Sequence, residues 1–393
     1  MVTSLRIMPS IIRLPPGGSR RIELQGGPVG EVTWLVNGVL GGNRDLGTID
    51  ENGFYVAPGK PARTEVVVEG RLGMRSTWAT VILDTRRDIY TYSGSWNRKG
   101  ENLTEAHSIE LEPSGKMLIA DPQQSRVVRF TTEGDFIGEI GRGRGSEPGQ
   151  FDGPRDIATD PDGNIFVADG NNCRLQAFDP DGDLLSCVGA MGTGTCEFLR
   201  PHSLDVGPDG NVYVIDVDNS RVTVHDKMGV LLRSWGKEGK RPEEFWAPHG
   251  ITVDPNGDVI VADFYGRCQR FTARGELLDI FANPSRVSLP AMDPSFGAMS
   301  LGHGNPTHGY YRYHAMTSDN LGNIYLMSRN MLKKRSCSVD KYNGSGDLVA
   351  QITLPPEAKR KMGGQGAAVS EEGRLYVSDT GPTHAGVMIF DPS

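Results

Sequence analysis

Alternating apolar and polar positions recur along most of the chain, in units of two short strands joined by a tight turn. In the clearest unit, His249 to Asp263, apolar residues alternate at Ile251 and Val253, a Pro-Asn-Gly turn follows, and alternation resumes at Val259 and Val261. A period of two predicts strands with one buried face, and the Asn-Gly step predicts a hairpin between them. The unit therefore predicts a pair of antiparallel strands.

This unit occurs six times after about residue 88, at intervals of 47 to 65 residues. The first residues of the six copies are His107, Arg155, His202, His249, His314 and Gln365. A period in the forties, with two strands visible and room for two more, is typical of a β-propeller blade. We therefore predict an all-β fold in which residues 85–393 form a six-bladed β-propeller.

The third strand of most units has its own form, a polar residue followed two positions later by arginine. It occurs in the segments NSRVTVHD, QSRVVRF and NCRLQAF, which begin at Asn219, Gln124 and Asn172. The full pattern, G-[IL]-x-V-D-x-x-G-N-[IV]-[YF]-V-x-D-x-x-N-x-R, resembles the NHL repeat family, which implies a propeller of NHL type. The turns DPDGN and DPDGD lack the later Glu of a calcium loop, so turn formation explains them better than calcium binding.

Residues 1–84 contain no copy of the unit and no cysteine. Their short alternating segments predict a small β-sandwich, with strands at Arg20–Leu24, Val32–Val36, Phe54–Val56, Thr64–Val68 and Thr77–Leu83. The segments TWLVNG and LGTIDENGFYVAP, which begin at Thr33 and Leu46, resemble the bacterial immunoglobulin-like domains. That resemblance implies an immunoglobulin-like spacer or packing module ahead of the propeller.

The propeller is expected to close on itself. The last copy, from Gln365, supplies only three strands, whereas the segment from Asp88 to Glu101 looks like a fourth strand with its exit loop. We therefore predict that the strand near residues 88–95 completes the final blade, which would remove two exposed sheet edges.

The charge balance narrows the classes of partner. The formal net charge of −8 and the pI near 5.6 give no electrostatic reason to expect nucleic acid or an anionic membrane. No stretch approaches the roughly 18 apolar residues of a membrane span. The expected partner is a small-molecule substrate. No pattern specifies an oligomeric state. We expect a cytoplasmic protein if Met1 is the native start, and a secreted or periplasmic one if a signal peptide was trimmed.

Five cysteines, an odd number, predict at least one unpaired thiol. Cys173 and Cys187 flank a turn almost symmetrically. They either face each other across a hairpin or lie on sheet strands as apolar thiols.

The six first positions are expected to converge on the central channel, because the innermost strand of each blade begins beside the axis. Four of the eight histidines of the chain occupy this position. Blades one, three and five are about 120° apart in a six-bladed ring, which would aim His107, His202 and His314 at one point. Three imidazoles with open positions suit a catalytic divalent metal, zinc first. His249 would be a fourth ligand or an outer hydrogen-bond donor. The alternative is that these histidines form hydrogen bonds across a wet channel.

The segment PHSLDV around His202 and the loop VADGNNCR (Val167 to Arg174) resemble the peptidyl-α-hydroxyglycine α-amidating lyases. The resemblance implies a zinc ion held by His107, His202 and His314, and cleavage of the C–N bond of a carbinolamide to give an amide and glyoxylate. The chain departs from the family at its substrate-gripping residues. It has no tyrosine in Asp169–Arg174, no arginine in Val217–Asn219 and none in SDTGPTHAG, which begins at Ser378.

Other residues are candidates for the missing roles. Arg155 would hold a carboxylate or stabilise an oxyanion, or else form a structural salt bridge to Asp156 or to a neighbouring blade. Tyr265 would act as general acid or base, or is an ordinary loop aromatic. Arg329 marks the fifth blade as atypical and is a candidate substrate contact.

The linker Ala282–Tyr313 is about eighteen residues longer than its counterparts. Long loops in compact domains often form lids or binding loops, so we expect this one to cover the channel mouth. It would bring Tyr313 or one of its neighbours near the substrate: His303, His308, Tyr310 or Tyr311. The alternative is a surface insertion.

Three functional hypotheses follow from these residues. The first is a metal-dependent lyase acting on a small polar or carboxylate-bearing substrate. The second is a lactonase-like hydrolase that uses metal-bound water, although Glu, Asn and Asp ligands typical of such enzymes are absent from the first positions. The third is a non-catalytic NHL scaffold, which would bind no metal.

Overall fold

The computed structural model describes residues 5–8, 11–14, 19–25, 31–59, 65–83, 89–97, 103–263, 266–281, 311–330, 336–344, 346, 348–355, 366–380 and 385–392. For residues 8, 11, 13, 25, 82, 311–314, 328–330, 336 and 337 it describes the backbone alone. Within these ranges the chain consists of strands and one short 3-10 helix, η1 (Gly170–Asn172). No helix in the described part is long and apolar enough to cross a membrane.

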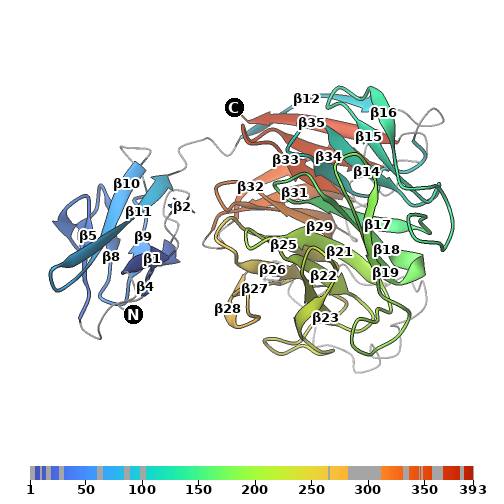
Figure 1. The fold of residues 1–393 in the computed structure, drawn as a ribbon. Coiled ribbons are helices and arrows are strands. Elements are labelled where there is room, and N and C mark those ends of the chain that lie inside the picture. Colours follow the sequence, from blue (N-terminus) through green and yellow to red (C-terminus); the bar gives the residue numbers. More distant parts are fainter. Residues whose placement is uncertain are drawn as a thin grey trace, which may run out of the picture.

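The N-terminal part is a β-sandwich, seen beside the propeller in Figure 1. One sheet has the strand order β2-β11-β10-β5-β6, another the order β3-β9-β8-β7, and β1 pairs with β4. The bounds are β1 Arg6–Met8, β2 Ile11–Leu14, β3 Ser19–Arg21, β4 Glu23–Gln25, β5 Thr33–Val36, β6 Val39–Leu40, β7 Gly42–Asn43, β8 Gly47–Ile49, β9 Phe54–Val56, β10 Glu65–Leu72 and β11 Arg75–Leu83.

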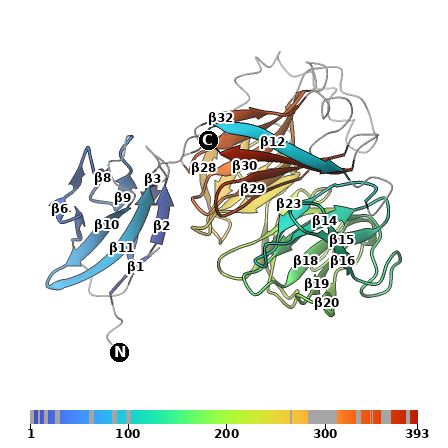
Figure 2. The same cartoon turned by 90° about the horizontal axis from the view of Figure 1, so that it is seen from above.

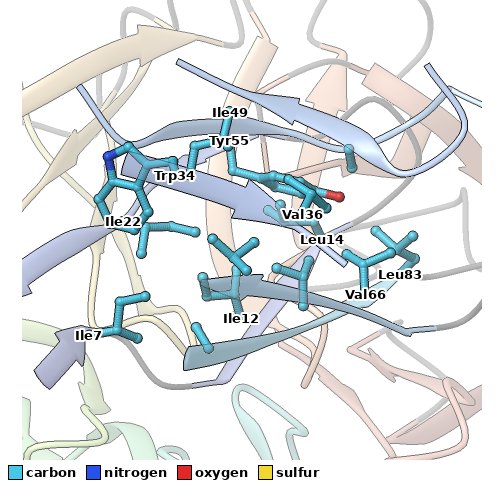
Figure 3. Close-up of a cluster of buried hydrophobic side chains, with 14 residues drawn as sticks. Ile7, Ile12, Leu14, Ile22, Trp34, Val36, Ile49, Tyr55, Val66 and Leu83 are labelled. Carbon is cyan, nitrogen blue, oxygen red and sulfur yellow. The ribbon is translucent and has the colours of Figure 1, made fainter. Parts of the chain in front are cut away.

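The alternating side chains of these strands meet in a single apolar core (Figure 3). Trp34 and Val36 of β5 point inward, as do Val66 of β10 and Tyr55 of β9. The hydroxyl of Tyr55 donates to the carbonyl of Leu46 at 2.6 Å, so its only polar atom is satisfied inside the core.

Six four-stranded sheets follow, and each is one blade of a propeller. Blades one to three are β13 Ile109–Leu111, β14 Met117–Asp121, β15 Arg126–Phe130, β16 Phe136–Ile140; β17 Pro154–Thr159, β18 Ile165–Asp169, β19 Arg174–Phe178, β20 Leu184–Val188; and β21 Pro201–Val206, β22 Val212–Asp216, β23 Arg221–His225, β24 Leu231–Trp235. Blades four to six are β25 Gly250–Val253, β26 Val259–Ala262, β27 Cys268–Phe271, β28 Leu277–Phe281; β29 Tyr311–Ser318, β30 Ile324–Asn330, β31 Ser336–Tyr342, β32 Leu348–Thr353; and β33 Ala367–Val369, β34 Leu375–Asp379, β35 Gly386–Pro392, β12 Tyr90–Asn97. The predicted all-β propeller fold is therefore confirmed.

The last blade is assembled from both ends of the propeller segment. Strand β12 pairs antiparallel with β35, from Tyr90 opposite Pro392 to Asn97 opposite Gly386. Figure 2 shows β12 lying along the outer side of this blade. Each pair of adjacent blades shares one apolar cluster, including the pair formed by blades six and one. The ring is thus closed by hydrogen bonds and by apolar packing.

One ion pair joins the sandwich to the propeller. The guanidinium of Arg20, in β3, contacts the carboxylate of Asp258 and donates to the carbonyl of Asn256 at 3.4 Å. Both partners lie in the turn between β25 and β26 of blade four. Arg270 also lies within 4.0 Å of Asp258, and its side chain is only 7% exposed. The burial of this network raises the pKa of Asp258 to about 6.

Among the described cysteines, Cys173, Cys187, Cys196 and Cys268 are free thiols. Cys187 lies opposite Gln176 in the β19–β20 ladder. Cys173 precedes β19 and donates to the carbonyl of Leu199. The alternative in which Cys173 and Cys187 face each other across the hairpin is therefore wrong.

Candidate active site on the propeller axis

The innermost strands of the six blades lie side by side around the axis. Strands β13, β17, β21, β25, β29 and β33 each contact the next, and β33 contacts β13. Their first positions consequently gather at one end of the channel. This geometry brings His107, His202 and His249 together, because each residue lies within two positions of the start of its strand.

The three imidazole rings are in contact. The ring centroids of His107 and His202 are 5.8 Å apart, and those of His202 and His249 are 4.8 Å apart. The backbone of His314 lies in β29, and its side chain is outside the described residues. The structure thus places three of the four predicted metal ligands in one cluster.

Backbone carbonyls set the tautomers of two of these rings. The Nδ1 atom of His107 lies 2.9 Å from the carbonyl oxygen of Arg155, and Nδ1 of His249 lies 2.9 Å from that of Ala247. A carbonyl only accepts, so Nδ1 carries the proton in each ring. In the neutral ring, Nε2 then carries the lone pair that a metal or a proton donor would use.

His202 differs from its two neighbours. Its Nδ1 atom is buried and has no hydrogen-bond partner among the described residues. Burial lowers the pKa of His202 well below 6.5, and the adjacent His249 and His107 lower it further, as do Arg155 and Arg200. The ring is therefore neutral at physiological pH, which is the form that binds metal ions.

These histidines are compatible with a metal ligand set, although the described part does not complete one. Two imidazoles bound to one zinc ion at about 2.0–2.1 Å place their ring centres about 5 Å apart. The observed separations of 5.8 and 4.8 Å bracket that value. Among the described side chains, no group of three His, Cys, Asp or Glu residues is arranged to hold a metal. The fit therefore depends on His314 as the third donor.

Two arginines and a glutamate surround the histidines at the channel mouth. Arg155 is the first position of blade two, and Arg200 and Glu105 stand two residues before the first positions of blades three and one. Burial lowers the pKa of Arg155, Glu105 counteracts this effect, and Arg200 adds to it. Burial also raises the pKa of Glu105. Arg155 is therefore close enough to Glu105 and to Arg200 for both charges to influence it.

The repeat itself fixes the backbone at this mouth. An aspartate ends the second strand of each of these blades and accepts backbone N–H groups that precede the innermost strand. Asp121 accepts from Glu105 at 3.1 Å, and Asp216 accepts from Arg200 at 3.0 Å. The Asp of the repeat therefore positions residues on the site face.

The arginine of the repeat secures the loops between blades. Arg174 donates to Asp169 and to the carbonyl of Gln150, each at 2.8 Å. The same arrangement recurs in the next two blades, through Arg221 with Asp216 and Glu197, and Arg267 with Asp263 and Glu244. These arginines stabilise the loops between blades, which explains why the third strand so often begins with an arginine.

Below the histidines, carboxylates link neighbouring innermost strands. Asp156 accepts from the hydroxyls of Ser108 and Ser203, and from the backbone of Leu204 at 3.0 Å. No ion pair of Arg155 with Asp156 or with a neighbouring blade occurs among the described residues, although Glu105 of blade one influences Arg155 electrostatically, so the roles of Arg155 stay predictions. The adjacent cavity, about 370 Å³ including open solvent, is also lined by Glu110 and Asp205.

The remaining predicted residues lie mostly outside the described part. This holds for Tyr265, His303, His308 and Tyr310. The backbones of Tyr313 and Arg329 belong to paired strands, where Tyr313 lies opposite Ser328 and Arg329 opposite Arg312. Their side chains are not described, so their roles stay predictions.

Sequence analysis missed Arg200 and Glu105. Both stand two residues before a first position, where the other blades have Gly153, Ala247, Arg312 and Gly363. Alignment of the copies two residues further upstream would have revealed charged residues at this position in three of the six blades, Glu105, Arg200 and Arg312.

Three segments, residues 151–178, 198–224 and 245–269, match the NHL repeat. A search of curated protein sequences returned no match. A putative gluconolactonase structure is 15% identical, with a TM-score of 0.50, and the match covers 78% of this chain and 94% of that one. A streptogramin B lyase is 12% identical, with a TM-score of 0.49 and coverage of 77% and 98%. A gluconolactonase from Xanthomonas campestris is 13% identical, with a TM-score of 0.49 and coverage of 79% and 95%. At such low identity, the first of these supports the propeller fold alone.

Proposed function

We propose that this chain is a metal-dependent lyase, similar to the peptidyl-α-hydroxyglycine α-amidating lyases, that acts on a small carboxylate-bearing substrate at the propeller axis. The observation that supports this best is the neutral ring of His202, in contact with His107 and His249 and beside the cation of Arg155. Neutral imidazoles bind metal ions, and a guanidinium binds carboxylates.

In this proposal His107, His202 and His314 hold a divalent metal, with zinc as the first choice. His249 is a fourth ligand or a hydrogen-bond donor beside the site. When bound, the metal supplies a Lewis acid for a hydroxyl or carbonyl oxygen of the substrate.

The other residues bind the substrate and move the proton. Arg155 orients the substrate through its carboxylate, and Arg329 is a second contact. Tyr265 or Tyr313 transfers the proton that cleavage requires. The neutral state of His202 keeps its lone pair available near pH 7.

We also propose that residues 1–84 form an immunoglobulin-like module that spaces or orients the propeller, residues 85–393. The two-sheet arrangement and the single core of the sandwich support this. The described core of the module is apolar, and we assign the chemistry to the histidine cluster of the propeller.

Elemental analysis of the purified protein tests the metal. We expect about one zinc or similar divalent ion per chain, and its loss in His202→Ala. His225→Gln is the matched control, since His225 is a buried histidine of β23 that donates or accepts within its own blade. Absence of metal from the wild-type protein would favour the scaffold hypothesis.

Mass spectrometry of products from a panel of small hydroxy acids, carbinolamides and lactones then separates the enzyme classes. A lyase splits the substrate without adding water, whereas a hydrolase adds the mass of one water. Products carrying that water would favour the lactonase-like alternative.

A further inference from the structure

Two arginines on adjacent blades present unsatisfied donors beside the histidine cluster. The guanidinium of Arg155 has no hydrogen-bond or ion-pair partner among the described residues. Arg200 forms an ion pair with Asp218 at 2.8 Å, yet its Nε atom is buried without a partner in the described part. Unsatisfied cationic donors in a partly buried site are costly unless a ligand satisfies them.

The backbone around Arg155 is shaped to admit its side chain. Gly170, the first residue of η1, lies under it, and a Cβ added at Gly170 would come within 2.7 Å of Arg155 Cγ. Gly153, two residues earlier in the chain, has a φ of +63°, and a Cβ there would approach the amide of Asn171 within 2.6 Å. Any larger residue at Gly170 would displace Arg155, so the position of the arginine is built into the fold.

The neighbouring charges favour a singly charged ligand. Glu105 acts on Arg155 from blade one, and Asp218 pairs with Arg200 from the β22–β23 loop. A dianion would meet about twice the repulsion from both carboxylates that a monoanion meets. A carboxylate is a singly charged, planar acceptor that suits guanidinium donors.

We propose that Arg155 and Arg200 form a two-point subsite for the carboxylate of a small molecule, placed beside the histidine cluster. This deepens the proposed function, on which it rests for the reacting part of the substrate. Arg200 is the specificity-determining member, because it adds a second cation on the blade adjacent to Arg155. Its ion pair with Asp218 restrains its side chain there.

Calorimetric titration with glycolate tests the subsite, with neutral glycolamide and inorganic phosphate as comparisons. We expect glycolate to bind the wild-type protein at least tenfold more tightly than glycolamide or phosphate. Arg155→Gln and Arg200→Gln should each weaken glycolate binding at least tenfold. Arg142→Gln, at an exposed arginine of the loop that follows β16, should bind as the wild type does.

Gly170→Ala probes the geometry without changing any charge. It should weaken glycolate binding because Arg155 must move, and thermal melting will show that the variant is folded. Equal glycolate binding by the wild type, Arg155→Gln and Arg200→Gln would overturn the inference. So would tighter binding of phosphate than of glycolate, or no glycolate binding at all.

Chelator-treated protein separates this inference from the proposed function. The effect of Arg155→Gln and Arg200→Gln on glycolate binding should persist after metal removal, because the subsite contains no metal ligand. If the purified protein holds no metal but shows these effects, the subsite stands and the lyase proposal fails. If metal is present and the substitutions have no effect, the lyase proposal stands and the subsite fails.

Discussion

The hydroxyl oxygens of Tyr90 and Tyr325 lie 2.7 Å apart, although 235 residues separate them in the chain. Tyr90 belongs to β12, the strand that closes the ring, and Tyr325 to β30 of blade five. Tyr325 donates to Asp319 at 3.0 Å, so it accepts from Tyr90. The ammonium of Lys341 lies over both rings, 5.7 and 5.5 Å from their centroids. The closing strand is therefore tied to blade five as well as to its own sheet.

Tyr90→Phe should reduce the free energy of unfolding by about 1 kcal/mol, the typical contribution of one buried hydrogen bond. Urea denaturation followed by circular dichroism measures this. Tyr92→Phe is the control, because Tyr92 is on the same strand but is 45% exposed, and its hydroxyl donates to Ser95 within that strand. An equal loss of unfolding free energy in both variants would show that the hydrogen bond between Tyr90 and Tyr325 does not contribute to stability.

Asp156→Ala should cost roughly 2–4 kcal/mol of unfolding free energy, because it leaves two serine hydroxyls and two backbone N–H groups in the channel wall without this acceptor. Asp162→Ala, at an exposed turn in the same blade, should change stability by less than about 0.5 kcal/mol. Denaturant midpoints of the two variants make the comparison. Similar midpoints would contradict the bridging role of Asp156.

The contribution of Glu110 to stability should fall as pH rises from about 5 to 8. Burial raises the pKa of Glu110 to about 8, and the carboxylate of Asp205 contributes to this rise. Burial also raises the pKa of Asp205, to about 6. The unfolded chain releases these protons near pH 4, so over this window the folded state binds more protons, and raising the pH favours unfolding. The stability of the wild type relative to Glu110→Gln should therefore fall as the pH rises through this window. Urea midpoints of both proteins measured across this range check the sign, and an advantage of the wild type that grows with pH would refute it.

Arg20→Glu should separate the sandwich from blade four, because it places two carboxylates together in a partly buried contact. Small-angle scattering should then report a larger radius of gyration. Arg21→Glu, at the exposed neighbouring position, should scatter as the wild type does. The double variant with Arg20→Glu and Asp258→Arg should regain the compact form, which would establish the pairing. Unchanged scattering in Arg20→Glu would exclude it.

The strands and the blade count could be predicted because a period of two and tight turns act locally. Arg155 and Asp156 do not pair among the described residues, for a related reason. Successive residues of a strand point in opposite directions, so Asp156 reaches Ser108 and Ser203 while Arg155 lies over Gly170 at the mouth. Arg200 and Glu105 escaped notice because they precede the alternating segment. Their place depends on hydrogen bonds to Asp216 and Asp121, which no local pattern reveals.

The position of β12 in the last blade affects how the chain folds during its synthesis. The hydroxyl of Ser93 donates a hydrogen bond to the carbonyl of Ile389, 296 residues later in the sequence. The first strand of the ring therefore cannot pair until the last one has been synthesised. Until then, an unpaired edge is open to other chains, and contacts between residues so distant in sequence form slowly. A nascent chain should therefore be most prone to aggregation just before its final strand emerges from the ribosome.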